Sequence, residues 1–351
     1  MSARVRAHGP GRVNIIGDHT DYSGGLALPM AIDLGTDVAL ERDGSLGRLE
    51  LSSADRPGRA VIDLAAPLSP GEAQPDWARY IAGVVAAVGP RCGGVGEVRS
   101  SLPIGAGLAS SAALEVATAL AVGFDGSPVE LALACQRAEQ TVAGVPCGVM
   151  DQLAAACGRQ GHALLIDCGS LEVSPIRLPD EVELIAVHSG ISRGLAGSAY
   201  ADRRAECEAA AAVVGPLRQA TVADVEPVPD PVLRRRARHV VTENARVLAV
   251  ARAIETGDLA SAGAAMAASH ASLAEDFEVS TPALDALVAE LAATPGVFGA
   301  RLTGAGFGGC VVALAERGTL AERGAPVLRG VRRGWVLEAS AGASVEVLGA
   351  A

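Results

Sequence analysis

Residues 103–113 (PIGAGLASSAA) constrain the fold most, because they place a glycine-rich turn directly before an alanine-rich helical run. A strand is expected near residues 95–103, and a helix is predicted from Ser110 to about residue 122. Glycines let the backbone approach a ligand closely, and the unpaired N–H groups at a helix start attract anions. The segment therefore predicts a phosphate-binding loop. The alternative is that Ser110 and Ser111 only cap the helix.

The absence of lysine narrows the kind of phosphate site, since all 29 basic side chains are arginines. A Walker A loop needs its lysine on the terminal phosphates, so that class of site is excluded. Phosphate chemistry here must use arginine, a metal ion and backbone N–H groups. A serine hydroxyl beside bound phosphates would suit Mg²⁺, which prefers oxygen ligands.

The length of 351 residues favours two domains that share one cleft. Short strands joined by tight turns are expected in the first forty residues, and helices at 129–143, 198–213, 231–255, 258–273 and 282–293. Strands are expected at 163–167, around 300–315 and near 343–348, which makes the second half α+β. We place the boundary between residues 1–180 and 181–351.

Charge and hydropathy limit the partners and the location. The net charge of −11 opposes non-specific binding to nucleic acid, which needs a basic surface. No apolar run approaches the roughly 20 residues that span a bilayer, and the N-terminus lacks the apolar core of a signal peptide. Seven scattered cysteines without a CxxC pair suggest neither disulfides nor zinc. We expect a cytoplasmic protein that binds neither membranes nor nucleic acid.

Residues 11–22 (GRVNIIGDHTDY) gather a cation, carboxylates, an imidazole and a phenol beside two glycines. Carboxylates and histidine suit the hydroxyls of a sugar or polyol, because each group accepts or donates along fixed directions. The alternative is a solvated acidic turn with Arg12 in a surface ion pair.

Two further turns carry candidate site residues. In residues 144–152 (GVPCGVMDQ), a turn brings Asp151 to the start of an apolar helix, where the helix dipole alone could explain a carboxylate. Its position relative to Arg12 decides between these interpretations. Residues 302–310 (LTGAGFGGC) form a second glycine-rich turn, which indicates either a hairpin or a cleft closed from both sides.

Together these segments resemble the superfamily of galactokinase, homoserine, mevalonate and phosphomevalonate kinases, and galactokinases most closely. GRVNIIGDHTDYSGG is similar to the galactokinase signature, PIGAGLASSAALEVA to the phosphate loop, GVPCGVMDQ to the catalytic segment and LTGAGFGGCVVAL to the C-terminal glycine motif. The resemblance runs from about residue 7 to 350. It implies an N-terminal domain like the second domain of ribosomal protein S5, a ferredoxin-like C-terminal domain, and an active site between them.

The resemblance also implies roles for individual residues in an ATP-dependent sugar 1-kinase, which we expect to be a monomer. Asp151 would orient or deprotonate the anomeric hydroxyl of galactose, and Arg12 would stabilise the transferring phosphoryl group. Ser111 and Glu139 would hold Mg²⁺. The sugar would contact Asp18, His19, Asp21 and Tyr200. ATP would contact Trp77 and Tyr80 around the adenine, and Gly105, Ala106, Gly107, Leu108, Ala109, Ser110 and Ser111 around the phosphates.

Two departures from the family pattern leave alternatives open. Asp18 stands where the family usually has glutamate, which weakens the sugar assignment and admits N-acetylgalactosamine or arabinose as substrate. Ala109 replaces a serine often seen in the phosphate loop. An alternative outside the enzymes is a sensor that binds sugar and ATP without phosphorylating anything. Trp77 and Tyr80 could equally be core residues, and we expect Asp151 mainly to orient the hydroxyl.

Overall fold

Strands and helices are interspersed along the chain in the computed structural model, which describes residues 3–65, 70–103, 105–144, 147–191, 196–319 and 333–350. The strands are β1 (Ala3–Asn14), β2 (Leu26–Ala27), β3 (Pro29–Asp43), β4 (Arg48–Ser53), β5 (Arg59–Asp63), β6 (Gly93–Ser100), β7 (His162–Asp167), β8 (Glu172–Arg177), β9 (Val182–His188), β10 (Val297–Leu302), β11 (Cys310–Glu316), β12 (Gly334–Leu337) and β13 (Ser344–Ala350). The α-helices are α1 (Ala78–Val88), α2 (Ser110–Ala121), α3 (Pro128–Ala143), α4 (Met150–Cys157), α5 (Ala196–Val214), α6 (Val222–Val225), α7 (Pro231–Thr256), α8 (Leu259–Glu275) and α9 (Pro282–Ala292).

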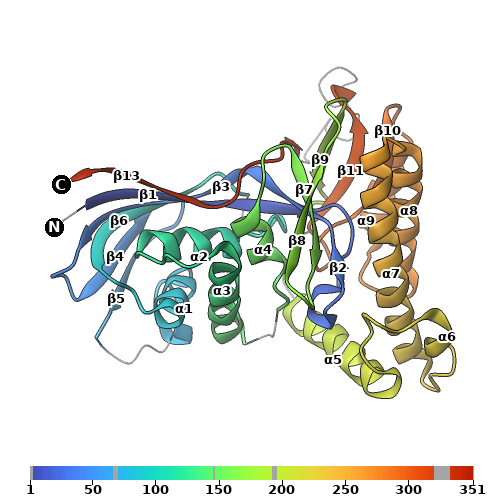
Figure 1. Ribbon diagram of the computed structural model, residues 1–351, viewed down its shortest axis with the longest axis horizontal. Coiled ribbons are helices and arrows are strands. Elements are labelled where there is room, and N and C mark those ends of the chain that lie inside the picture. The colour runs from blue at the N-terminus through green and yellow to red at the C-terminus, as the bar shows by residue number, and fades with distance from the viewer. Residues whose placement is uncertain are drawn as a thin grey trace.

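The N-terminal half is built on a six-stranded sheet with the order β13-β1-β3-β6-β4-β5. Helix α2 packs on β1 and β3, and α1 and α3 pack against it on the same side of the sheet (Figure 1). Small side chains allow this close packing, since a Cβ on Gly9 of β1 would lie 2.2 Å from the carbonyl oxygen of Ala113. The sheet therefore fixes the start of α2, and with it the predicted phosphate loop.

The C-terminal half contains a four-stranded sheet with the order β10-β11-β9-β12. Helices α8 and α9 pack on β10, and α7 packs on α8. A small sheet of β2, β7 and β8 lies between this part and the N-terminal helices (Figure 1). One buried apolar cluster joins the halves, because it includes Ile15 and Met30 together with Leu184 and Val312.

The last strand, β13, belongs to the second half of the sequence but pairs within the sheet of the first half. Strand β13 pairs antiparallel with β1, so Ser344 lies opposite His8. The two termini consequently lie side by side at one end of the molecule (Figure 1). Residues 344–350 thus belong to the sheet of the first half, and the division into 1–180 and 181–351 stays a proposal for the rest of the chain.

The N-terminal strands are longer than the sequence predicted. Strands β1 and β3 have 12 and 15 residues, whereas short strands with tight turns were expected. Strand β1 ends at Asn14, and residues 15 and 16 form a bend that still hydrogen-bonds to Leu28 before the turn at Asp18 and His19. The helices predicted at 198–213, 231–255, 258–273 and 282–293 correspond to α5, α7, α8 and α9.

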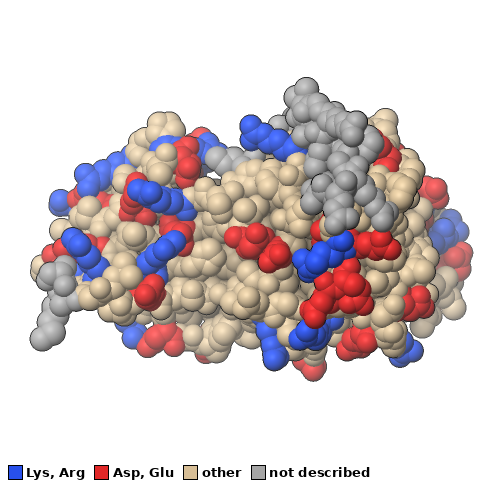
Figure 2. All heavy atoms as spheres, turned by 90° about the horizontal axis from the view of Figure 1, so that it is seen from above, with Lys and Arg blue, Asp and Glu red and all other residues tan. Residues whose placement is uncertain are grey.

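Charged side chains of both signs are interspersed over the face shown in Figure 2. Among the described helices, none is long and apolar enough to cross a bilayer.

Candidate active site

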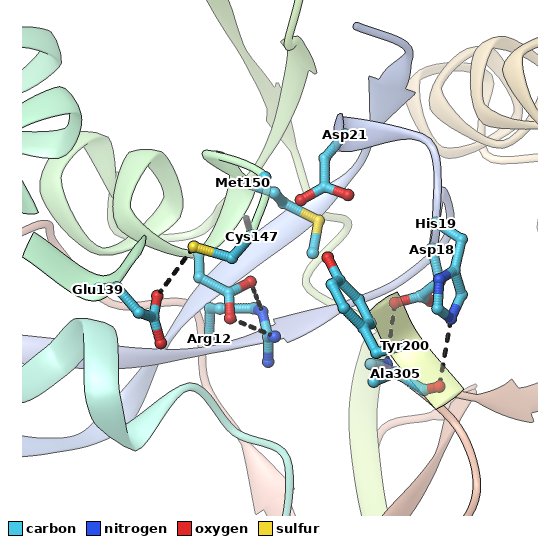
Figure 3. A pocket seen from close by; sticks show the side chains of 12 residues that line it. Arg12, Asp18, His19, Asp21, Glu139, Cys147, Met150, Tyr200 and Ala305 are labelled. Atoms are coloured by element: carbon cyan, nitrogen blue, oxygen red, sulfur yellow. Dashed lines mark hydrogen bonds and ion pairs between the residues drawn. The ribbon is translucent and has the colours of Figure 1, made fainter. Parts of the chain in front are cut away.

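A cavity of about 150 Å³ collects side chains from both halves of the chain. Figure 3 shows Arg12 and Glu139 on one side of it, with His19 and Tyr200 on the other. Seven residues predicted from the sequence line it: Arg12, Asp18, His19, Asp21, Glu139, Asp151 and Tyr200. Segments that are far apart in the sequence are thus brought to one site.

Arg12 and Asp151, which both line this cavity, form a bidentate ion pair. The Nε and Nη2 atoms of Arg12 each donate to one carboxylate oxygen of Asp151 at 2.7 Å. Burial has the largest influence on the pKa of Arg12 and would lower it, but the charge and hydrogen bonds of Asp151 and the charges of Asp18 and Asp21 together raise this pKa. The arginine side chain is only 6% exposed, so the surface ion pair considered above is wrong. Asp151 therefore does more than complement a helix dipole.

The phosphate loop has the conformation that its glycines allow. Gly105 and Gly107 adopt φ values of 75° and 83°, and Ala109 is also left-handed at 57°. A non-glycine residue in this region costs about 1 kcal/mol or more. Helix α2 begins at Ser110 without a side-chain cap, so the capping alternative for the two serines is wrong. Arg12 Nη1 donates to the carbonyl oxygen of Gly107 at 2.6 Å, which ties this loop to the ion pair.

Ser111 and Glu139 meet where a metal ion was predicted. The hydroxyl of Ser111 donates to Glu139 at 2.7 Å, and Gln152 donates to the other carboxylate oxygen at 2.5 Å. Burial raises the pKa of Glu139, as does the charge of Asp151. Adjacent ligands of an octahedral Mg²⁺ ion lie about 2.9 Å apart, so these two oxygens fit such an ion. In the described ranges, no cluster of three or more His, Cys, Asp or Glu could hold a metal.

A second cavity, of about 230 Å³, lies beside the phosphate loop. Trp77 and Tyr80 line it together with Ser110 and Ser111. The two aromatic rings are therefore not sealed in the core, although Trp77 also packs against a buried apolar cluster. Ser111 lines this cavity and its partner Glu139 lines the first, so the Ser111–Glu139 pair lies between the two cavities.

The loop from Asp18 to Tyr22 presents polar groups to the first cavity. The ring nitrogens of His19 lie 3.0 Å from the hydroxyl of Tyr22 and 3.2 Å from the carbonyl oxygen of Ala305. Tyr200 packs beside His19, with ring centroids 5.6 Å apart. Burial and the charge of Asp151 raise the pKa of Asp21 to about 7. This carboxyl group therefore changes its charge near neutral pH.

Asp18 borders the cavity but is only 2% exposed. One of its oxygens accepts the N–H of Gly304 at 2.8 Å, and the other lies 2.7 Å from Nη2 of Arg301. Asp18 thus joins residues 11–22 to the second glycine-rich turn, which connects the antiparallel strands β10 and β11 as a hairpin and also lines the cavity.

Several functional candidates were not predicted from the sequence. Cys147, Gly148 and Met150 line the first cavity because they precede Asp151 in its turn, and Ala305 lines it from the opposite turn. Beneath Glu139, the fully buried Glu115 accepts from Gln152 at 3.2 Å, and burial raises its pKa well above the usual range. A helical spacing of four residues from Ser111 to Glu115 was the available signal. Ile104, Val145 and Pro146, which belong to the quoted motifs, lie outside the described residues.

Three family descriptions match the chain. The galactokinase galactose-binding signature matches residues 2–42, the N-terminal domain of GHMP kinases matches residues 79–159, and the C-terminal domain of GHMP kinases matches residues 250–329. Together they cover the segments that supply Arg12, Ser111, Asp151 and Arg301.

Curated relatives match over most of the chain. The chain is 45% identical over 325 residues to galactokinase from Bos taurus, a match that covers 88% of this chain and 82% of the relative. Galactokinase from Roseiflexus sp. is 44% identical over 337 residues, with 90% and 84% covered.

Solved structures share the fold. Galactokinase from Lactococcus lactis, crystallised with galactose, aligns with a TM-score of 0.87 at 28% identity and covers 97% of this chain and 95% of its own. Mevalonate kinase from Methanococcus jannaschii aligns with a TM-score of 0.68 at 21% identity, with 97% and 98% covered. The likeness confirms the predicted α+β kinase fold, with a domain like the second domain of ribosomal protein S5 and a ferredoxin-like domain.

Proposed function

The chain belongs to the galactokinase family, and from this membership we propose that it transfers the γ-phosphoryl group of ATP to the anomeric hydroxyl of galactose, which gives galactose 1-phosphate. One observation carries the proposal: two cavities lie on either side of the hydrogen-bonded pair of Ser111 and Glu139. ATP in the larger cavity would present its terminal phosphate to a sugar in the smaller one. Phosphoryl transfer depends mainly on such in-line positioning and on neutralising charge.

We assign Asp151 and Arg12 to the reacting groups. In the ion pair, Arg12 keeps a fixed positive charge next to the carboxylate, and its third contact reaches the phosphate loop at Gly107. This position suits an arginine that stabilises negative charge on the transferring group. Because Arg12 holds both oxygens of its carboxylate, Asp151 orients the sugar hydroxyl and receives its proton only as the bond to phosphorus forms.

Magnesium fits the junction of the two cavities. Ser111 and Glu139 are the residues that would hold it, and the phosphate oxygens and water would complete its shell. When bound, the ion would neutralise charge on the phosphate oxygens of ATP.

The remaining predicted contacts divide between the two substrates. We propose that His19, Asp21 and Tyr200 contact the sugar hydroxyls, with Asp18 at the border of the same cavity. Trp77 and Tyr80 would hold the adenine, and the segment from Gly105 to Ser111 would surround the phosphates. Action as a monomer in the cytoplasm stays a prediction.

The test is ADP release from Mg-ATP with galactose, 2-deoxygalactose, N-acetylgalactosamine, arabinose, glucose and mevalonate. We expect turnover on galactose and a loss of about 1000-fold in kcat for Asp151→Ala, without a change in the KM for ATP. Asp125→Ala, in an exposed ion pair with Arg91, is the matched control.

Other results would replace the proposal. Turnover only on N-acetylgalactosamine or arabinose would reassign the substrate within the sugar kinases. Binding of ATP and galactose without any ADP release would support the sensor instead.

A further inference from the structure

A network of buried charges lies behind the sugar cavity, at the back of the loop that carries His19 and Asp21. Its first member is Arg301 on β10, whose side chain is fully buried. Arg301 pairs with Asp18 at 2.7 Å and donates from Nη1 to the carbonyl oxygen of Ile15 at 3.1 Å. One arginine from the C-terminal half thus holds this loop through the side chain of Asp18 and through the backbone of Ile15.

Glu243 on α7 is the second member and is also fully buried. It accepts the N–H of Gly17 at 3.1 Å, the hydroxyl of Ser269 at 2.6 Å and Nε of Arg246 at 2.7 Å. Burial would raise the pKa of Glu243, but His239, Arg301 and Arg246 lower it to about 2. Glu243 is therefore ionised, and it compensates the buried charge of Arg301, which lies 3.8 Å away.

His239 lies one helical turn before Glu243 and contacts the next residue of the loop. Its Nε2 atom is 3.1 Å from the carbonyl oxygen of Asp18, and a carbonyl can only accept, so Nε2 carries the hydrogen. The His239 ring packs on Phe277, which in turn packs on His19, with centroids 4.6 and 4.7 Å apart. Helix α7 consequently fixes the N–H of Gly17, the C=O of Asp18 and the ring of His19.

The loop needs this support because its backbone is strained. Gly17 has φ 97°, and His19 has φ 63° although it is not glycine. A non-glycine residue in the left-handed region costs about 1–3 kcal/mol and persists only where its surroundings determine it. Contacts to the residues just before His19 supply that constraint.

We propose that Arg301 and Glu243 are positioning residues for the sugar: they hold the segment from Gly17 to Asp21 so that His19 and Asp21 face the substrate. The proposal rests on the proposed function of the cavity as a sugar site. Neither residue lines either cavity, so both act through the loop. Replacing either residue should weaken the binding of the sugar and leave the binding of ATP intact.

The first experiment measures steady-state kinetics of Glu243→Gln, Arg301→Lys and Arg301→Met, with galactose and ATP varied in turn. For Glu243→Gln we expect the KM for galactose to rise about 10-fold or more and the KM for ATP to stay within about twofold. Arg301→Lys should be milder than Arg301→Met, since lysine keeps the charge beside Asp18. Glu50→Gln is the matched control, because Glu50 on β4 is also a buried carboxylate paired with arginines, Arg48 on β4 and Arg59 on β5.

A second measurement reports on the loop without substrate. Hydrogen exchange should show faster exchange of the amides in residues 15–22 in Glu243→Gln than in wild type or Glu50→Gln. If Glu243→Gln does not fold, Ser269→Ala removes one hydrogen bond to Glu243 and should show a smaller shift in the same direction.

The outcomes separate two failures. No turnover by the wild type on any sugar would overturn the proposed function, whereas the exchange result would still decide the positioning role. Equal weakening of ATP and galactose, or kinetics and exchange like those of Glu50→Gln, would overturn the positioning role itself.

Discussion

The two cavities of the active site are assembled from very different lengths of chain. The larger one is lined by residues between Thr36 and Leu114, all from the N-terminal half. The smaller one takes residues from Arg12 to Ala305 and includes the second glycine-rich turn, at Gly304 and Ala305. The proposed nucleotide site is thus a property of one half, whereas the proposed sugar site exists only where both halves meet.

The cavities also differ in charge. Arg12, Asp18, Asp21, Glu139 and Asp151 all line the smaller cavity. Keeping several charges away from water costs stability unless they are paired, and Asp21 and Glu139 respond with raised pKa values. We therefore expect substitutions in the smaller cavity to change both sugar binding and the stability of the protein. Substitutions in the larger cavity should change only ATP binding.

The largest expected effect on a KM value comes from Gly148→Ala. A Cβ at this position would lie 1.8 Å from Oδ2 of Asp21 and would displace that carboxylate from the sugar cavity. We expect the KM for galactose to rise about 100-fold, with the KM for ATP within about twofold, in the same kinetic assay. Gly47→Ala, whose Cβ would meet nothing within 4 Å, is the control. A rise in both KM values would remove the distinction between the cavities.

A smaller effect, on ATP and not on galactose, is expected from Trp77→Ala. Loss of an aromatic wall of the larger cavity should raise the KM for ATP about 10-fold and leave the KM for galactose unchanged. Steady-state kinetics with Trp335→Ala, which removes the other tryptophan, serve as the comparison. If ATP binds Trp77→Ala as tightly as wild type, Trp77 is only a packing residue.

The smallest effect concerns stability and pH. Folded Asp21 keeps its proton up to about pH 7, whereas an unfolded aspartate releases it near pH 3.9. The folded state binds more protons in this window, so the free energy of unfolding falls as pH rises through it. Asp21→Asn should therefore melt about 2–5 °C above wild type at pH 8, and this gain should shrink toward pH 4.

Thermal melts at several pH values check this, with the exposed Asp125→Asn as control for the loss of a carboxylate. A gain in melting temperature that does not depend on pH would contradict the assigned titration.

Sequence reasoning recovered the parts of the site that lie in short motifs. Arg12 and Asp151 were named from turns with unusual polar residues, and Ser111 and Glu139 from the family resemblance, and the structure brings each pair within hydrogen-bond distance. Helices α7 to α9 followed from their apolar periodicity. The long strands β1 and β3 did not, because glycines inside them resembled turns.

The buried network was not predicted because its partners are far apart in the sequence. Glu243 contacts Gly17 across 226 residues, and Arg301 contacts Ile15 across 286. One signal was present: Glu243 occupies the same helical stripe as Val240 and Val247, where a carboxylate needs a buried partner. Only tertiary structure identifies that partner.

The pairing of β13 with β1 has a consequence for synthesis. About 330 residues separate the two strands, so at roughly 5–20 residues per second the edge of β1 waits about 15–65 s for its neighbour to be translated. An open strand edge invites pairing with other chains. During synthesis, β1 is thus open to pairing with other chains until β13 has been translated. A chaperone that shields β1 would act during elongation.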